Sequence, residues 1–319
     1  MIRIHPAELQ RMHDELQDAI RNHAEWHRHL IRTLVCRLAS DPEDLRADAH
    51  QACGFGRWFF HQAQRDLQGR PQYLSIDAEH RALHELAAAV LREASDSDAV
   101  SRESFDRFVE SSSRLRRELD SLRHDMAVAL RSRDTLTGTY RRAEILPTLR
   151  EARELVIRGV QTCCVAFMDL DHFKVVNDSH GHGLGDEVLA RAARCVIEHL
   201  RAYDKVFRYG GDEFLLLLPG THPEEAWYLV DRIRSGLAER KLCTTPEGQP
   251  LQLTASFGIT SIEADLPVEE CIARADKALM LAKAAGRNHV VCWDPASATG
   301  SALERELSEP PASPGSAVR

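Results

Sequence analysis

The segment Tyr209-Gly210-Gly211-Asp212-Glu213-Phe214 limits what this chain can fold into more than any other stretch. Its adjacent glycines indicate a tight turn between two strands, because glycine tolerates the positive φ values that hairpin turns often require. The apolar residues 215–218 predict a buried strand, so two carboxylates lie where the chain re-enters that strand. A divalent cation offsets the repulsion between neighbouring carboxylates, and Mg²⁺ favours such oxygen ligands. On its own, the segment fits a solvated hairpin tip with incidental acids equally well, since Gly and Asp are common turn residues.

A second carboxylate follows an apolar stretch farther upstream. The run Val165-Ala166-Phe167-Met168 leads directly into Asp169, which predicts an acid at the end of a strand. Two strand-end acids on adjacent strands allow Mg²⁺ ions to bridge the phosphates of a nucleotide and to contact an attacking oxygen. Together the two acidic segments favour a metal-dependent nucleotide site.

Two further segments supply groups that a nucleotide requires. Residues 177–186 are polar and rich in glycine, and they precede an apolar-periodic helix predicted near residues 188–200. Such a segment offers backbone amides and short polar side chains. Lys283 and Arg287 lie four residues apart, which predicts two cations on one helical face, placed to hold the β- and γ-phosphates of a triphosphate.

In this order, the segments resemble the motifs of GGDEF-type diguanylate cyclases, over about 160 residues. The resemblance rests on Asp134-Thr135-Leu136-Thr137-Gly138, Asp169-Leu170-Asp171-His172-Phe173-Lys174, Asn177-Asp178, Gly181-His182-Gly183-Leu184-Gly185-Asp186, Gly210 to Phe214, and Ala282-Lys283-Ala284-Ala285-Gly286-Arg287-Asn288. It implies a palm like that of adenylyl cyclases, in which helices surround a central, mostly antiparallel sheet. It also implies a reaction that converts two GTP into cyclic di-GMP and two pyrophosphates.

The resemblance assigns roles to the matching positions of this sequence. It implies two Mg²⁺ ions per active site, bound by Asp169, Asp212, Glu213 and the carbonyl of Leu170. It also implies that Asp212 or Glu213 helps to deprotonate the attacking 3′-hydroxyl. An amide and a carboxylate can match the edge of guanine, and adenine would leave them unpaired. The implied substrate contacts are Asn177, Asp186 and the nearby His182 for guanine, and Lys174, Lys283 and Arg287 for the triphosphate.

Two phosphodiester bonds require two GTP-loaded domains that face each other, so the resemblance implies a homodimer. The segment Arg201-Ala202-Tyr203-Asp204 matches the Arg-x-x-Asp site at which cyclic di-GMP inhibits many family members, and Arg232 is predicted as a further product contact. An exposed salt-bridge corner is the alternative for so short a motif. Met280 and Tyr140-Arg141 depart from the family pattern, which often has tyrosine and Asn-Arg there, but neither position is catalytic.

The first 130 residues have a different character. They contain three glycines, almost no strand pattern, and apolar residues at helical spacing that begin with Leu9, Met12 and Leu16. This pattern predicts an all-α bundle whose antiparallel helices break at Pro42 and at Gly69-Arg70-Pro71. A long polar helix predicted from about residue 101 to residue 133 leads out of the bundle.

Histidine and cysteine residues form a candidate metal site in this bundle. His80 and His84 have the spacing that places two imidazoles on one helical face, a frequent source of two zinc ligands. A thiolate from Cys53 with three imidazoles would complete a tetrahedral site. Spacing alone does not decide the matter, because the chain has 16 His and because His23 and His27 form another pair four residues apart.

His23, the segment Cys53-Gly54-Phe55-Gly56-Arg57-Trp58, and Glu79-His80-Arg81-Ala82-Leu83-His84 resemble the chemoreceptor zinc-binding domain, a four-helix bundle. The resemblance implies the zinc ligands His23, Cys53, His80 and His84, with His23 favoured over His27. It also implies a regulatory zinc ion that inhibits the cyclase. The expected architecture is an α+β multidomain chain, in which an all-α four-helix zinc-binding bundle precedes an adenylyl-cyclase-palm-like GGDEF α/β domain.

Length, net charge and composition are compatible with this two-domain architecture. A length of 319 residues predicts two domains, and a formal net charge of −8 argues against a nucleic-acid groove. We expect the zinc-binding domain at 1–125, a helical linker at 126–133, the cyclase domain at 134–294 and a disordered tail at 295–319. Apolar runs too short for a membrane and an amphipathic N-terminus predict a cytoplasmic protein. Most of the eight Cys are expected to be buried thiols in a reducing compartment.

Three alternatives stay open. A degenerate domain that keeps only Arg201 and Asp204 would be a receptor for cyclic di-GMP, although the intact acidic segments argue against it. A zinc-dependent scaffold with dormant chemistry would change its oligomeric state with zinc. Oxidation of a zinc-bound Cys53 thiolate would release the metal and make the bundle a redox sensor.

Overall fold

The computed structural model describes residues 6–63, 71–97 and 99–294. The described residues divide into two compact units, one that ends at Arg131 and one that begins at Ser132. The domain boundaries expected after residues 125 and 133 stay predictions. The tail expected at 295–319 and the turn at Gly69-Arg70 lie outside the described residues. Within the described part of the chain, no helix is both long and apolar enough to cross a membrane.

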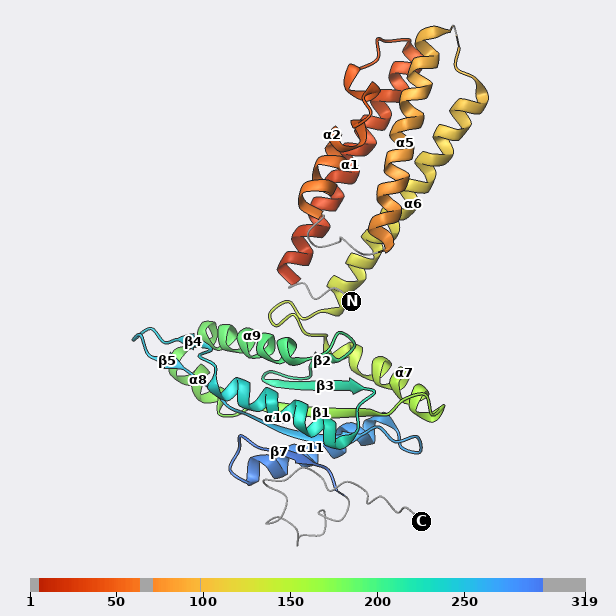
Figure 1. Cartoon of the computed structure of the whole chain (residues 1–319). Coiled ribbons are helices and arrows are strands. Elements are labelled where there is room, and N and C mark those ends of the chain that lie inside the picture. The colour runs from red at the N-terminus through yellow and green to blue at the C-terminus, as the bar shows by residue number, and fades with distance from the viewer. Residues whose placement is uncertain (1–5, 64–70, 98, 295–319) are drawn as a thin grey trace. The chain divides into compact units, whose positions relative to one another are not determined.

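The N-terminal unit is a helical bundle in which three of the described helices are long, with 26 to 31 residues each (Figure 1). Leu9, Met12 and Leu16 are buried, as their helical spacing predicts. Pro42 and Pro71 each open a new helical element, where the missing N–H of proline costs no hydrogen bond. The elements are α1 (Pro6–Cys36), η1 (Pro42–Leu45), α2 (Ala49–Ala52), α3 (Gly54–Trp58), the π-helix η2 (Phe59–Ala63), α5 (Pro71–Asp96) and α6 (Arg102–Ser132).

The C-terminal unit is built on a five-stranded sheet in the order β2-β3-β1-β6-β7 (Figure 1). All neighbouring strands are antiparallel except β6 and β7, which are parallel. The mostly antiparallel sheet of the expected palm is therefore confirmed. The strands are β1 (Cys163–Leu170), β2 (Lys205–Arg208), β3 (Glu213–Pro219), β6 (Ala255–Ser261) and β7 (Val290–Cys292), with a separate ribbon of β4 (Cys243–Thr244) and β5 (Pro250–Leu251).

Helices cover both faces of this sheet. On one face, α8 (Phe173–His180), α9 (His182–His199) and α10 (Pro223–Glu239) share a core with Met168 and Phe214. On the other face, α7 (Ile145–Ile157), which follows the short η3 (Arg142–Glu144), and α11 (Val268–Ala284) share a core with Phe167 and Leu215. The α+β architecture expected from the sequence, an all-α bundle followed by a palm-like domain, is confirmed.

The polar segment at residues 177–186 is more helical than predicted. It contains the end of α8, a junction at Gly181 and the first turn of α9, which begins at His182 instead of near Val188. Gly181 has a φ of 81°, which lets the chain turn between the two helices. Its polar residues resemble a loop in sequence, yet they occupy the solvent side of helices that bury Val176 and Val188.

A turn at Asp134 opens the sheet-containing unit and is tied to the strand edge. Asp134 Oδ1 accepts a hydrogen bond from the Thr137 N–H at 2.9 Å. The Tyr140 N–H donates to the Val206 carbonyl at 2.8 Å, and the Arg208 N–H donates to the Tyr140 carbonyl at 2.8 Å. Tyr140, which departs from the family pattern, therefore extends the sheet beside β2.

Candidate active site and metal centre

The two predicted strand-end acids face each other across adjacent strands. Asp169 in β1 is paired with Glu213, the first residue of β3. Directly opposite residues project from the same face of a sheet, which places both carboxylates on the α11 side. Asp212 lies in the turn just before Glu213, and its carbonyl accepts the Leu170 N–H at 3.4 Å. The register confirms that the acids lie on neighbouring strands.

The groups around Asp169 act on it electrostatically. Burial raises the pKa of Asp169, the hydrogen bond and charge of Lys283 oppose this rise, and Asp212 and Glu213 raise the pKa further. Lys283 Nζ lies 2.8 Å from Asp169 Oδ2. A divalent cation would relieve the repulsion among three carboxylates more fully than one ammonium can. The donor set therefore fits Mg²⁺.

The glycines of the hairpin serve a different purpose from the one predicted. Neither Gly210 nor Gly211 is among the described residues with positive φ, so the expectation of a left-handed turn is wrong. A Cβ on Gly210 would lie 2.5 Å from Glu213 Oε2, so the missing side chain makes room for the carboxylate. Arg208 secures the turn by donating Nη2–H to the Gly211 carbonyl at 3.0 Å, and its Nη1 lies 3.2 Å from Asp134 Oδ1.

Sequence reasoning missed the role of Asp171. This side chain is 1% exposed and accepts hydrogen bonds from Thr254 Oγ1 at 2.7 Å, Ser256 Oγ at 2.8 Å and the Asn288 N–H at 2.9 Å. It thereby ties the chain after β1 to β6 and to the turn that follows α11. Its position directly after the strand-end segment was the available signal, but its partners are more than 80 residues away in sequence.

The predicted guanine contacts lie on two neighbouring helices. Asn177 belongs to α8, whereas His182 and Asp186 belong to the first turns of α9. A Cβ on Gly185 would lie 1.9 Å from Asn177 Oδ1, so the amide lies directly against the residue that precedes Asp186. The structure thus brings Asn177 and Asp186 to the same helix junction, and their role in guanine binding stays a prediction.

Lys283 and Arg287 do not share a helical face, so that prediction is wrong. α11 ends at Ala284, and Gly286, with a φ of 116°, turns the chain away from the helix axis. Arg287 follows with a φ of 64°, and its N–H donates to the Ala282 carbonyl at 3.2 Å. Arg287 and Lys174 are exposed. The phosphate-binding roles of these three cations stay predictions.

The predicted product contacts lie near the end of α9. Asp204 is buried, and its Oδ2 accepts the backbone N–H of Arg201 at 2.7 Å. The exposed Arg201 guanidinium reaches the Tyr203 hydroxyl at 3.4 Å. Arg232 of α10 donates to the His199 carbonyl at 3.2 Å. Asp204 therefore shapes the turn that presents Arg201, and product binding by all three residues stays a prediction.

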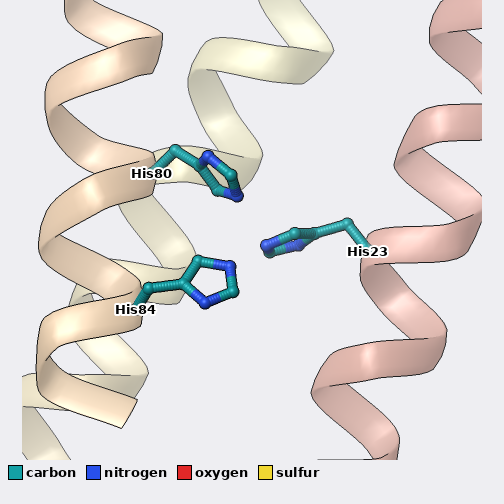
Figure 2. A group of neighbouring side chains, drawn as sticks. All are labelled: His23, His80 and His84. Atoms are coloured by element: carbon teal, nitrogen blue, oxygen red, sulfur yellow. The ribbon is translucent and has the colours of Figure 1, made fainter. Parts of the chain in front are cut away.

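Three of the predicted zinc ligands converge inside the bundle (Figure 2). His23 projects from α1, and His80 and His84 project from α5, with one ring nitrogen of each within 4.8 Å of the others. Cys53 Sγ lies 3.4 Å from His80 Nε2. His27 instead stacks on Phe108, with the ring centroids 5.3 Å apart. The structure thus separates His23 from His27, which spacing alone could not do.

The chemistry of this triad fits a zinc ion. All three imidazoles are buried, and His23 Nε2, His80 Nδ1 and both nitrogens of His84 have no hydrogen-bond partner among the described residues. Burial is the main cause that lowers the pKa of His23 to about 4, that of His84 to about 3 and that of His80 well below the usual value. Neutral imidazoles with free lone pairs are good zinc ligands. Burial raises the pKa of the Cys53 thiol, so metal binding there would release a proton.

Comparison with known families matches both parts of the chain. The family model described as the diguanylate cyclase GGDEF domain matches residues 131–289, and that of the chemoreceptor zinc-binding domain matches residues 23–91. Diguanylate cyclase DgcZ of Escherichia coli (strain K12) is 30% identical over 285 residues, which cover 88% of this chain and 93% of DgcZ. Diguanylate cyclase DgcP of Pseudomonas aeruginosa is 38% identical over 157 residues, 49% of this chain and 23% of DgcP.

Solved structures show the same similarity. Diguanylate cyclase SiaD of Pseudomonas aeruginosa, in complex with its activator SiaC, is 31% identical to this chain, with a TM-score of 0.52. The match covers 74% of this chain and 96% of the SiaD chain. The structure of the coiled coil and GGDEF domain of DgcB from Caulobacter crescentus, in complex with c-di-GMP, is 28% identical to this chain, with a TM-score of 0.50. The match covers 58% of this chain and 94% of the DgcB chain. The chain therefore belongs to the family of GGDEF diguanylate cyclases and carries a chemoreceptor zinc-binding domain ahead of its cyclase domain.

Proposed function

We propose that this chain condenses two GTP into cyclic di-GMP as a homodimer, and that zinc held in the N-terminal bundle inhibits the reaction. The observation that carries the proposal is the pairing of Asp169 with Glu213 on adjacent strands, with Lys283 at 2.8 Å. This cluster concentrates acids and a cation at one strand end, as a metal-dependent phosphoryl-transfer site requires.

The reaction needs one new bond from each nucleotide. The side chains of Asp169, Asp212 and Glu213 and the carbonyl of Leu170 would hold two Mg²⁺ ions, which neutralise charge on the phosphates when bound. The 3′-oxygen of one GTP attacks the α-phosphorus of the other, and the bond to pyrophosphate breaks. Asp212 or Glu213 accepts the proton of the 3′-hydroxyl. The reciprocal attack closes the ring and releases the second pyrophosphate.

The helix junction of α8 and α9 would select the base. Asn177 and Asp186 offer an amide and a carboxylate, which match the donors and acceptors of guanine, and His182 begins α9, four residues before Asp186. Adenine would leave those polar groups unpaired, at a cost of about 1–3 kcal/mol for each buried group. Lys283, with Lys174 and Arg287, would neutralise the triphosphate.

Dimer formation is part of the proposed mechanism because each cyclase domain binds one GTP. Two domains that hold their nucleotides in reciprocal orientation replace a random encounter with a positioned one. Cyclic di-GMP bound at Arg201, Asp204 and Arg232 would restrain this approach and so inhibit its own synthesis. The exposed guanidinium of Arg201 is suited to a phosphate or to a guanine edge.

Zinc would act on the same dimer equilibrium. Zinc ligation would join α1, α5 and the segment that contains Cys53, and α6 leads without interruption from Arg102 to Ser132, next to the Asp134 turn. Coupling of this kind is reciprocal, so GTP or product should also change the affinity for zinc.

The test of the catalytic assignment uses the full chain with GTP and Mg²⁺ and quantifies cyclic di-GMP by chromatography. Asp212→Ala and Glu213→Gln should abolish product formation and preserve the helical circular dichroism. Glu239→Gln, at an exposed position at the end of α10, is the matched control and should retain activity. Normal product formation by a folded Glu213→Gln or Asp212→Ala variant would refute the corresponding role.

A further inference from the structure

Trp26 lies directly on the proposed zinc site. It follows His23 by three residues on α1, and its indole stacks on the His84 imidazole with ring centroids 4.1 Å apart and an interplanar angle of 27°. The same indole lies 4.9 Å from the His23 ring centroid. The three imidazoles are buried, whereas Trp26 is half-buried. The indole therefore contacts two of the three imidazoles drawn in Figure 2 and is more exposed than either of them.

A carboxylate holds this indole in place. Trp26 Nε1–H donates a hydrogen bond of 2.7 Å to Asp44 Oδ1 in η1. The neighbouring Leu45 carbonyl accepts a hydrogen bond from Arg92 of α5 at 3.0 Å. η1 is thus tied to both helices that carry the imidazoles. It also leads into α2, after which Cys53 follows directly.

We propose that Trp26 and Asp44 form a latch over the zinc site: the indole orients the His84 ring and closes the site, and the carboxylate keeps the indole closed. Both are positioning residues, since an indole has no atom that binds zinc and Asp44 is not among the side chains that converge at the site. The proposal rests on the zinc site proposed above. Groups that orient metal-bound imidazoles typically change metal affinity about 10–100-fold when removed.

The latch predicts how zinc leaves the protein. Zinc can exchange with water or a chelator only after the indole moves, and this motion breaks a hydrogen bond to a charged acceptor in a partly dry environment. A hydrogen bond of that kind shifts the equilibrium between the closed and open positions by roughly tenfold or more. Loss of the latch should therefore speed zinc release by about tenfold.

The test is zinc release from the zinc-loaded full chain into an excess of a fluorescent chelator. Trp26→Phe and Asp44→Ala should each release zinc about tenfold faster than the native chain, and the double variant should be no faster than the faster single variant. Asp44→Asn should release zinc more slowly than Asp44→Ala, because its amide oxygen still accepts the indole N–H although the charge is lost. Zinc loading should change the tryptophan fluorescence of the native chain and leave that of Trp26→Phe nearly unchanged.

Trp58 provides a matched control in the same bundle. Its Nε1–H donates to Glu15 Oε2 at 3.3 Å, and its ring contacts Phe55 at 5.7 Å between centroids. Trp58→Phe should leave the release rate within about twofold of the native value. Equal acceleration by Trp58→Phe, additive effects of the two latch variants, or release by Asp44→Asn as fast as by Asp44→Ala would each overturn the latch. Failure of the native chain to take up one zinc per chain would instead overturn the zinc site itself.

Discussion

Acid should destabilise the metal-free N-terminal unit because of the buried histidines. Burial lowers the pKa of His23 to about 4 and that of His84 to about 3, whereas an unfolded histidine titrates near 6.5. Between these values the unfolded chain binds protons that the folded chain excludes, so the free energy of unfolding falls as the pH falls. The stability is fully present above pH 6.5 and is lost progressively as the pH falls toward the folded pKa values.

The size of the effect follows from these two pKa values. At about pH 5 each of His23 and His84 should cost the folded state about 2 kcal/mol relative to pH 7.5. The two together cost about 4 kcal/mol, and His80, whose pKa is also lowered, adds to the loss. A domain is typically stable by only about 5–15 kcal/mol, so the metal-free unit should be close to unfolding at pH 5.

Hydrogen exchange read out by peptide mass separates this unit from the other. With zinc chelated, the stability derived from α1 and α5 peptides should fall by about 4 kcal/mol or more between pH 7.5 and 5, after correction for intrinsic exchange rates. His84→Gln removes one titrating group and should reduce that fall by about 2 kcal/mol. Peptides of α9 and α10 in the other unit serve as the internal reference. A fall below about 1 kcal/mol, or a fall that His84→Gln leaves unchanged, would refute the reasoning.

Three further predictions concern the cyclase domain. Lys283→Ala removes the cation 2.8 Å from Asp169 and should lower turnover at least about tenfold in a cyclic di-GMP assay, whereas an unchanged rate would exclude an electrostatic role. Asp171→Ala removes the acceptor of three buried hydrogen bonds and should lower the urea-unfolding free energy of this unit by about 2–4 kcal/mol, so a loss under 1 kcal/mol would contradict its positioning role. Arg201→Ala should preserve initial turnover and reduce inhibition by added cyclic di-GMP, and undiminished inhibition would show that Arg201 is not part of a regulatory site.

The sequence predicted the acidic cluster because its pattern is local. One apolar run ends at Asp169 and another begins just after Asp212 and Glu213, and the antiparallel register then brings Asp169 opposite Glu213. The conformation of the hairpin was not predictable in the same way. Glycine permits positive φ but does not require it, and here the space beside Gly210 holds the Glu213 carboxylate. Whether a glycine serves conformation or space depends on neighbours that the local sequence does not specify.

Lys283 and Arg287 show that the four-residue spacing rule fails where a helix ends between the two residues. A separation of four residues places two side chains on one face only where the helix continues, and α11 ends at Ala284, before Arg287. The following Gly286 was a visible stop signal, since glycine commonly ends helices in a left-handed conformation. The same kind of error, in reverse, led to a helix predicted from near Val188, although α9 begins at His182.

The zinc site depended on information beyond spacing. His23 and His27 are equivalent by their four-residue separation, and only the rotation of α1 against α5 directs His23 toward the triad and His27 toward Phe108. Trp26 and Asp44 gave no recognisable signal, because a hydrogen bond between residues 18 apart follows from where η1 returns against α1. Side-chain contacts of this kind can be identified only once the fold is known.

The most direct test of a zinc-inhibited diguanylate cyclase is the rate of cyclic di-GMP formation by the full chain from GTP and Mg²⁺, at a series of buffered zinc concentrations. The rate should fall as zinc rises in the native chain and stay constant in His84→Gln, which lacks a proposed zinc ligand but retains every proposed catalytic residue. A native rate that does not respond to zinc would contradict the regulatory role of the bundle, and the absence of product at any zinc concentration would contradict the proposed catalysis.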